Sequence, residues 1–90
     1  MGIQPTSGLA AGMDLRQIFA TNLRRLRHEK GISQEELANV AEVDRAHVSR
    51  IERGLHYVGL EIVEKFAEIL EAEPAEFLRL PKRGGRKTKG

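Results

Sequence analysis

Between Ser33 and Gly54 the chain carries two short amphipathic segments separated by a break near Asp44. Apolar residues recur in each segment at three- and four-residue spacing, the periodicity of a helix that packs one face on a core. Ala38 supplies the small residue that two helices need where they cross closely. The inward positions are apolar: Leu37, Ala41, Val43, Val48 and Ile51. This pattern predicts two short helices that cross steeply, and it constrains the fold more than any other feature.

Helix boundary signals surround both segments. Ser33 with Glu36 three residues later forms a capping box for the first segment, and Asp44 is expected to cap the second. Gly54 is expected to end the second segment. An earlier helix is predicted to begin after Asp14 and to end at Gly31, with an apolar face of Leu15, Ile18, Phe19, Leu23 and Leu26.

The region after Gly54 also has helical periodicity. A fourth apolar face is formed by Leu60, Val63, Phe66, Ala67 and Leu70. Pro74 fits the first turn of a short fifth helix that carries Phe77 and Leu78. No alternating strand pattern occurs in the sequence. We therefore predict an all-α fold, a compact five-helix domain over residues 14–80.

Length and composition exclude several classes of protein. Ninety residues suffice for one small domain. The sequence has no cysteine, which excludes disulfides and thiolate metal sites. No apolar run approaches the ~18 residues of a membrane-spanning helix. The first residues lack a basic start and a long apolar stretch, so no signal peptide and a cytoplasmic location are expected.

Charge is unevenly distributed along the chain, although the net charge is only +2. Residues 81–90 carry five Lys/Arg and no acidic residue. We expect this segment to be a disordered basic tail, and residues 1–13, rich in small residues, to be a disordered leader. The tail is compatible with a polyanionic partner and equally with a solubilising role.

The second helix of the crossed pair has an outer face suited to a groove of DNA. A helical wheel places Val48 and Ile51 inward and Arg45, Ala46, Ser49, Arg50 and Arg53 on the opposite arc. Arginine can pair bidentately with guanine, and alanine can contact a thymine methyl group. The alternative interpretation is an ordinary solvated face. The whole spacing, rather than this helix alone, favours a helix-turn-helix that enters the major groove.

Two stretches carry a family resemblance: NLRRLRHEKGISQEELA at residues 22–38 and VSRIERG at residues 48–54. They resemble the XRE-type, lambda-repressor-like helix-turn-helix family, which includes phage repressors, Cro proteins, restriction-modification controller proteins and antitoxins. The resemblance covers about residues 15–80. It implies a lambda-repressor-like DNA-binding domain whose recognition helix spans about residues 45–53.

The resemblance also implies roles for single residues. DNA base contacts are expected from Arg45, Ala46, His47, Ser49 and Arg50. Phosphate contacts are expected from Ser33, Gln34, Arg53, His56 and Tyr57. Arg27 and Glu52 resemble a structural ion pair between the first and third helices.

Two positions depart from the family pattern. Glu42 stands where the family usually has a glycine, because the backbone of that turn is often left-handed. The loop after Gly54 reads Leu-His-Tyr-Val-Gly and lacks the common Asn-Pro. The turn at Glu42 is therefore expected to be strained or differently shaped. The contacts of the loop with the DNA backbone are less secure than the contact expected from Gln34.

The function expected from this resemblance is sequence-specific binding of double-stranded DNA by a transcriptional regulator, a repressor acting as a homodimer on an inverted repeat. Two recognition helices would then lie roughly 34 Å apart. The interface is expected on the fourth and fifth helices, in the region of Phe66, Leu70, Phe77, Leu78 and Leu80.

The alternative function is a protein-interaction module on the same fold, of the antitoxin or antiactivator type. It would need an exposed apolar patch near Val40 or residues 77–80. No catalytic arrangement is recognisable, so we expect no enzyme, cofactor or metal. The histidines lack metal-ligand spacing, and a small-molecule effector is not expected.

Overall fold

The computed structural model describes residues 14–80, so the predictions for the leader (1–13) and the basic tail (81–90) fall outside the described residues. The described residues form helices and no β-strand. In chain order these are α1 (Leu15–Lys30), α2 (Gln34–Ala41), α3 (Arg45–Glu52), α4 (Leu60–Leu70) and the short 3₁₀ helix η1 (Pro74–Leu78). None of these helices is long and apolar enough to cross a membrane.

The prediction of five α-helices is wrong in one element. The part of the chain that the structure describes holds four α-helices, and the segment Pro74–Leu78 is a 3₁₀ helix. Pro74 lacks a backbone N–H, and Arg79 directly after the segment is extended. Leu80 precedes Pro81, a position that disfavours helical backbone. The segment is therefore too short for the hydrogen-bond ladder of an α-helix, and 3₁₀ helices are typical of such short pieces.

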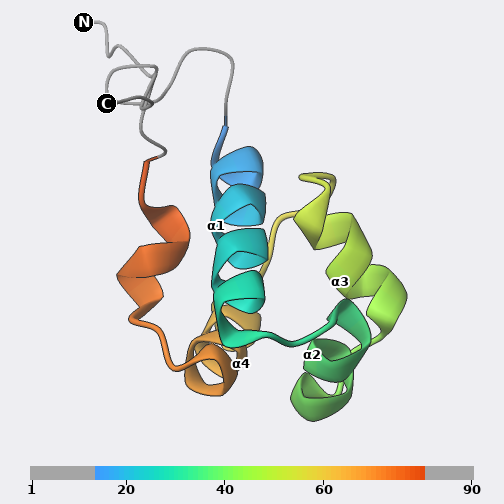
Figure 1. Cartoon of the computed structure of the whole chain (residues 1–90). Helices are drawn as coiled ribbons and strands as arrows, with labels where there is room; N and C mark the ends of the chain where they lie inside the picture. Colours follow the sequence, from blue (N-terminus) through green and yellow to red (C-terminus); the bar gives the residue numbers. More distant parts are fainter. Residues whose placement is uncertain (1–13, 81–90) are drawn as a thin grey trace, which may run out of the picture.

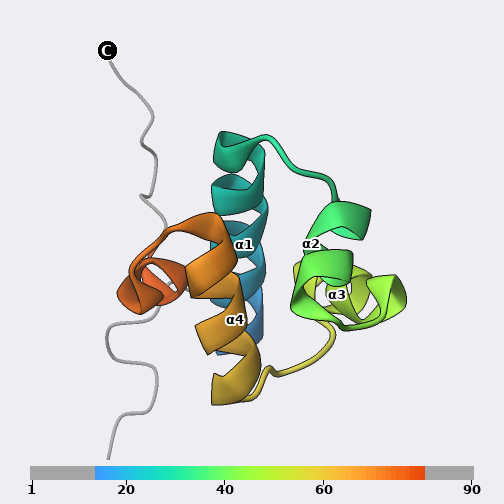
Figure 2. The same cartoon turned by 90° about the horizontal axis from the view of Figure 1, so that it is seen from below.

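Helix α1 lies between η1 on one side and α2 and α3 on the other, and α4 packs against α1, α2 and η1 (Figures 1 and 2). The largest fully buried side chains come from every element: Ile18, Leu23, Leu37, Val48, Ile51, Phe66 and Phe77. The rings of Phe19 and Phe77 stack with centroids 5.0 Å apart and join α1 to η1. The core therefore holds the crossed pair α2–α3 against α1, so that the outer face of α3 points away from the domain.

The helix boundaries follow the local signals. The Asp14 carboxylate accepts a hydrogen bond from the Gln17 amide at 3.2 Å, and Ser33 Oγ accepts one from the Glu36 amide at 3.0 Å. Gly31 ends α1 in the left-handed region with φ of 78°. These side chains and the glycine provide for backbone groups that would otherwise lack partners at the helix ends.

The turn between α2 and α3 is left-handed at Glu42, with φ of 62°. The Val43 amide donates to the Ala38 carbonyl oxygen at 3.0 Å and closes the turn. Asp44 occupies the N-cap position of α3, but its side chain makes no capping hydrogen bond, so the prediction that it caps α3 is wrong in that respect. The start of α3 therefore depends on the shape of the turn and on packing.

Asn22 anchors η1 to α1 from inside the core. Its side chain is 3% exposed, and Nδ2 donates to the carbonyl oxygens of Phe77 at 3.0 Å and Arg79 at 2.8 Å. A buried amide that satisfies two carbonyl groups across the chain replaces the hydrogen bonds that a short 3₁₀ segment cannot make internally.

Burial corrects the expected dimer interface. Phe66 and Phe77 are 0% exposed and Leu70 is 5% exposed, so these three side chains belong to the domain core and their assignment to an interface is wrong. Leu78 and Leu80 are 51% and 44% exposed. Helix periodicity marks apolar faces, but it cannot show whether the surface opposite such a face comes from the same chain or from a second one.

Candidate nucleic-acid interface

The outer face of α3 is polar and open. Arg45, Ala46 and Arg50 are exposed, whereas His47 and Ser49 are half-buried. Val48 and Ile51, on the opposite arc, are 0% and 1% exposed. The helix is thus anchored by one stripe and presents the residues expected to read bases along the other.

The arginines of this face carry unopposed charge. No ion pair among residues 14–80 involves Arg45, Arg50 or Arg53. Arginine with free donors is the side chain best suited to guanine edges and phosphates. The surface can therefore bind a polyanion without first breaking an intramolecular ion pair.

A buried ion pair holds the C-terminal end of α3 against α1. Arg27 Nε and Nη2 donate to the Glu52 carboxylate at 2.6 and 3.0 Å, and the two side chains are 10% and 3% exposed. Arg27 Nη1 also donates to the Ile32 carbonyl oxygen at 2.8 Å, in the connection that leads to α2. A bidentate geometry of this kind fixes orientation as well as distance. It ties α1, the start of α2 and α3 into one unit.

The expected phosphate contacts at the start of α2 are joined to the same network. Gln34 Nε2 donates to Glu52 Oε1 at 3.0 Å, which leaves its second N–H free. Ser33 Oγ accepts a cap bond from the Glu36 amide and keeps its own hydroxyl proton free to donate. Both side chains can therefore offer a donor while they are held in place by the fold.

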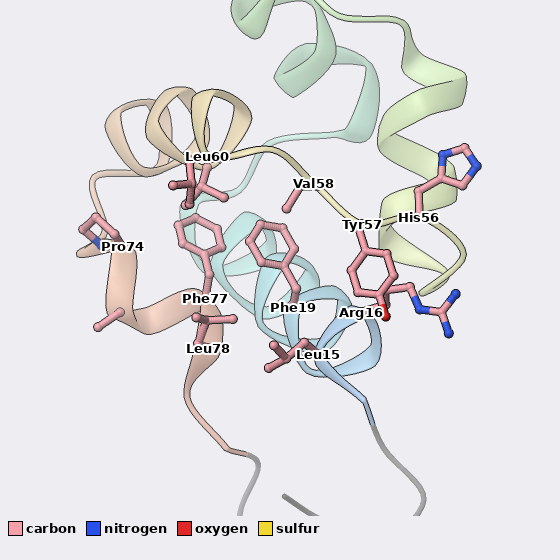
Figure 3. A pocket seen from close by; sticks show the side chains of 12 residues that line it. Leu15, Arg16, Phe19, His56, Tyr57, Val58, Leu60, Pro74, Phe77 and Leu78 are labelled. Carbon is pink, nitrogen blue, oxygen red and sulfur yellow. The ribbon is translucent and has the colours of Figure 1, made fainter. Parts of the chain in front are cut away.

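The loop after α3 sends its expected phosphate contacts in two directions. His56 lies beside His47 of α3, with ring centroids 5.8 Å apart. Tyr57 turns toward α1, where the Arg16 guanidinium lies 4.9 Å from the ring centroid (Figure 3). Arg16 also bonds Asp14 at 2.7 Å, and this contact holds the pKa of the Asp14 carboxyl below its usual value. Tyr57 is thus brought to the start of α1, whereas His56 lies beside α3.

An apolar groove of about 400 Å³ opens between α1, the loop after α3, α4 and η1 (Figure 3). Its wall includes Leu15, Phe19, Leu60, Phe77 and Leu78. Leu60 is 85% exposed, more than any other large apolar side chain among residues 14–80. The groove extends from the loop after α3, where His56 lines it, to η1, and its apolar wall differs in chemistry from the arginine-bearing outer face of α3.

Sequence reasoning missed Asn22, Arg24 and the groove. Each depends on contacts between segments far apart in the chain, for which the sequence holds no local signal. Arg24 is visible in the sequence as one arginine of the Leu-Arg-Arg-Leu-Arg run, but its contact with the end of α3 depends on how α1 and α3 pack. Within residues 14–80 no three potential metal-ligating His, Asp or Glu side chains gather at one place.

A family model described as a helix-turn-helix domain matches residues 18–80, which is most of the chain. Among curated proteins, a hypothetical transcription factor of Neisseria meningitidis serogroup B is 41% identical over 68 residues, 76% of this chain and 64% of that protein. The chain thus spans somewhat less than two thirds of the length of this relative. Control protein C.BamHI of Bacillus amyloliquefaciens is 35% identical over 66 residues, 72% of this chain and 82% of that protein.

A solved structure shares both the fold and the sequence pattern. The restriction-modification controller protein C.AhdI from Aeromonas hydrophila superposes with a TM-score of 0.66 at 42% identity. The match covers 69% of this chain and 94% of that one. The relatives thus include a hypothetical transcription factor and controller proteins, and the region matched by the family model contains α2, α3 and their turn.

Proposed function

Because this chain belongs to the XRE-type helix-turn-helix family, we propose that it is a sequence-specific DNA-binding transcriptional repressor that reads the major groove with α3. The observation that carries the proposal is the outer face of α3, where Arg45 and Arg50 are exposed and have no carboxylate partner among residues 14–80. A regulator needs such a face on a rigid element, and the core provides that rigidity.

In this proposal the two sets of contacts have different tasks. Arg45, Ala46 and Arg50, with His47 and Ser49 beside them, read base edges. The phosphates carry no sequence information themselves, and contacts with them set the register of the protein on the DNA. The donors for these contacts are Ser33, Gln34, Arg53, His56 and Tyr57. The Glu52 carboxylate links both sets, since it bonds Gln34 and closes α3 on Arg27. A shift of α3 relative to the phosphate contacts is thereby resisted.

We propose that the protein acts as a homodimer on an inverted repeat, with the interface on the outer surface of α4 and η1. The supporting observation is that Leu60 and Leu78, which line the apolar groove, are 85% and 51% exposed, and that Leu80 after η1 is 44% exposed. Exposed apolar side chains that gather at one surface favour association. A twofold pair would present two copies of α3 to successive major grooves.

The test of direct reading is substitution on α3. Arg45→Ala and Arg50→Ala are each expected to weaken binding to DNA fragments selected from the source genome by ~1–3 kcal/mol, with the fold intact by circular dichroism. Arg79→Ala is the matched control, because it removes the same charge from an exposed position beyond η1, on the other side of α1 from α3. Unchanged affinity in both α3 variants would overturn reading through this helix.

A second candidate function is supported by one observation. Val40, on the outside of α2, is 60% exposed, and Leu78 and Leu80 are exposed at the far side of the domain. These are the positions that an antitoxin- or antiactivator-type contact with a protein partner would need. This function predicts a partner complex that survives Arg45→Ala and is lost in Val40→Ser, as measured by co-purification from the source organism.

A further inference from the structure

A small polar notch lies beside the C-terminal end of α3, where this helix meets α1. Its volume is about 270 Å³, and its wall is formed by Gln17, Ala20, Thr21, Arg24, Arg53 and Gly54. No acidic side chain belongs to this wall. Two guanidinium groups, a hydroxyl group and an amide therefore border one small space without an opposing carboxylate.

Arg24 differs from the other arginines of α1. Arg16, Arg25 and Arg27 each form an ion pair with a carboxylate. Arg24 forms none with any residue of the described range 14–80, and its Nη1 donates instead to the backbone carbonyl oxygen of Glu52. This bond positions the guanidinium at the end of α3 while most of its donors and its whole charge remain available.

The Glu52 side chain does not neutralise this charge. Its carboxylate is buried and accepts hydrogen bonds from Arg27 and Gln34. Arg53, the next residue along the chain, is exposed and also lacks an ion pair among the described residues. Four arginines of residues 14–80 thus have no carboxylate partner. Arg45, Arg50 and Arg53 belong to α3 and its C-cap, and Arg24 belongs to α1.

Gly54 keeps the notch open. A Cβ atom at this position would lie 3.3 Å from Gln17 Cγ, and the backbone φ of +73° is one that L side chains rarely adopt. Any side chain here would crowd the wall contributed by α1. The end of α3 thus reaches its left-handed turn without filling the space between Gln17 and Arg24.

We propose that this notch binds a phosphodiester group of the DNA backbone, so that the nucleic-acid interface continues from α3 onto α1. Arg24 and Arg53 supply the charge, and Thr21 and Gln17 supply neutral donors. The inference rests on the proposed function, since Arg53 belongs to both surfaces and α1 runs beside α3 (Figure 1). It adds Arg24, Thr21 and Gln17 to the residues that contact DNA.

The experiment compares Arg24→Gln with Arg79→Gln, which removes an equal charge from the far side of α1. Binding of the full chain to a selected DNA fragment and to an unrelated fragment is measured over a range of salt concentrations. If Arg24 contacts a phosphate, Arg24→Gln weakens binding to both DNA fragments by the same factor. It also reduces the magnitude of the slope of log binding constant against log salt concentration by about 1. Arg79→Gln is expected to leave both slopes unchanged.

A purely structural role of Arg24 gives a different result. If Arg24 only supports the end of α3, Arg24→Gln weakens binding to the selected fragment and lowers the melting temperature, but leaves the salt slope as it was. That result overturns the proposal. Thr21→Val adds a variant that keeps the shape and removes one donor, and it is expected to weaken binding to both fragments by the same factor.

Neutral phosphates provide a direct readout. A single methylphosphonate is placed in turn at each position along the selected fragment. At one position it is expected to weaken DNA binding by the wild-type protein and to leave DNA binding by the Arg24→Gln variant unchanged. Absence of any such position also overturns the proposal. If Arg45→Ala weakens specific binding while Arg24→Gln changes nothing, the proposal that the notch binds a phosphodiester group is wrong and the proposed function stands. If neither substitution has an effect, the proposed function itself fails.

Discussion

At the scale of single residues, Glu42 shows how the hydrogen bonds that end a helix impose a backbone conformation on an unsuited side chain. Its φ of 62° lies in the left-handed region, which costs an L residue other than Asn or Asp on the order of 1 kcal/mol. The Val43 amide reaches the Ala38 carbonyl oxygen only through this turn. The hydrogen bond and the packing of α2 on α3 therefore outweigh the local strain.

Replacing Glu42 with glycine is expected to raise the free energy of unfolding by up to about 1 kcal/mol, because glycine adopts positive φ without a Cβ penalty. Chemical denaturation at neutral pH measures the change. Glu42→Ala is the control, since it removes the charge and keeps the Cβ atom. An equal gain in both variants would attribute the effect to the carboxylate rather than to strain.

At the scale of helices, the N-terminus of α1 is an electrostatic unit. Arg16 donates to the Asp14 carboxylate, and the Gln17 amide donates to its other oxygen. Both contacts favour the charged form and lower the pKa of Asp14 below 3.8. A carboxyl whose pKa is lower in the folded state stabilises the fold above its unfolded pKa, and this contribution is lost as the pH falls through the folded value.

Asp14→Asn separates charge from capping, because asparagine can still accept the Gln17 amide. The variant is expected to melt at a slightly lower temperature than the wild type at pH 7. The difference between the two is expected to close as the pH falls below 3.8, the ordinary value for Asp14. Thermal melts across this range provide the measurement, and a difference that persists undiminished in acid would contradict the assignment.

At the scale of the whole molecule, the described residues form two surfaces of different chemistry. The arginine face belongs to α3, and the apolar groove lies between α1, α4 and η1 (Figures 1 and 3). A single copy of the domain can bury only one recognition helix in DNA. Association through the apolar side would leave both copies of α3 free, which is what an inverted repeat requires.

The double variant Leu60→Ser with Leu78→Ser is expected to shift the protein from dimer to monomer in sedimentation velocity and to abolish cooperative binding to an inverted repeat. The fold is expected to persist, because the two side chains are 85% and 51% exposed. Leu55→Ser is the control, since Leu55 is 50% exposed and lies outside the groove. A wild-type protein that sediments as a monomer at micromolar concentration, even with operator DNA, would contradict the dimer.

Local signals predicted much of the fold. Gly31, Ser33 and Asp14 act within one helical turn of themselves, so their effect is visible in the sequence. The inward position of Val48 and the outward position of Arg50 follow from helix periodicity alone. By contrast, the missing side-chain cap at Asp44 and the 3₁₀ form of the last segment depend on the surrounding packing, and the burial of Phe66 depends on contacts with residues far along the chain.

The sequence by itself determined where the helices lie and which stripe of α3 faces outward, because backbone hydrogen bonding and amphipathic spacing operate over a few residues. Only the tertiary structure decided which charges remain free. Arg27 and Arg24 belong to the same run of basic residues, yet one is buried against Glu52 and the other borders an open notch. That difference arises from where α3 ends relative to α1, a distance set by the packing of the whole core.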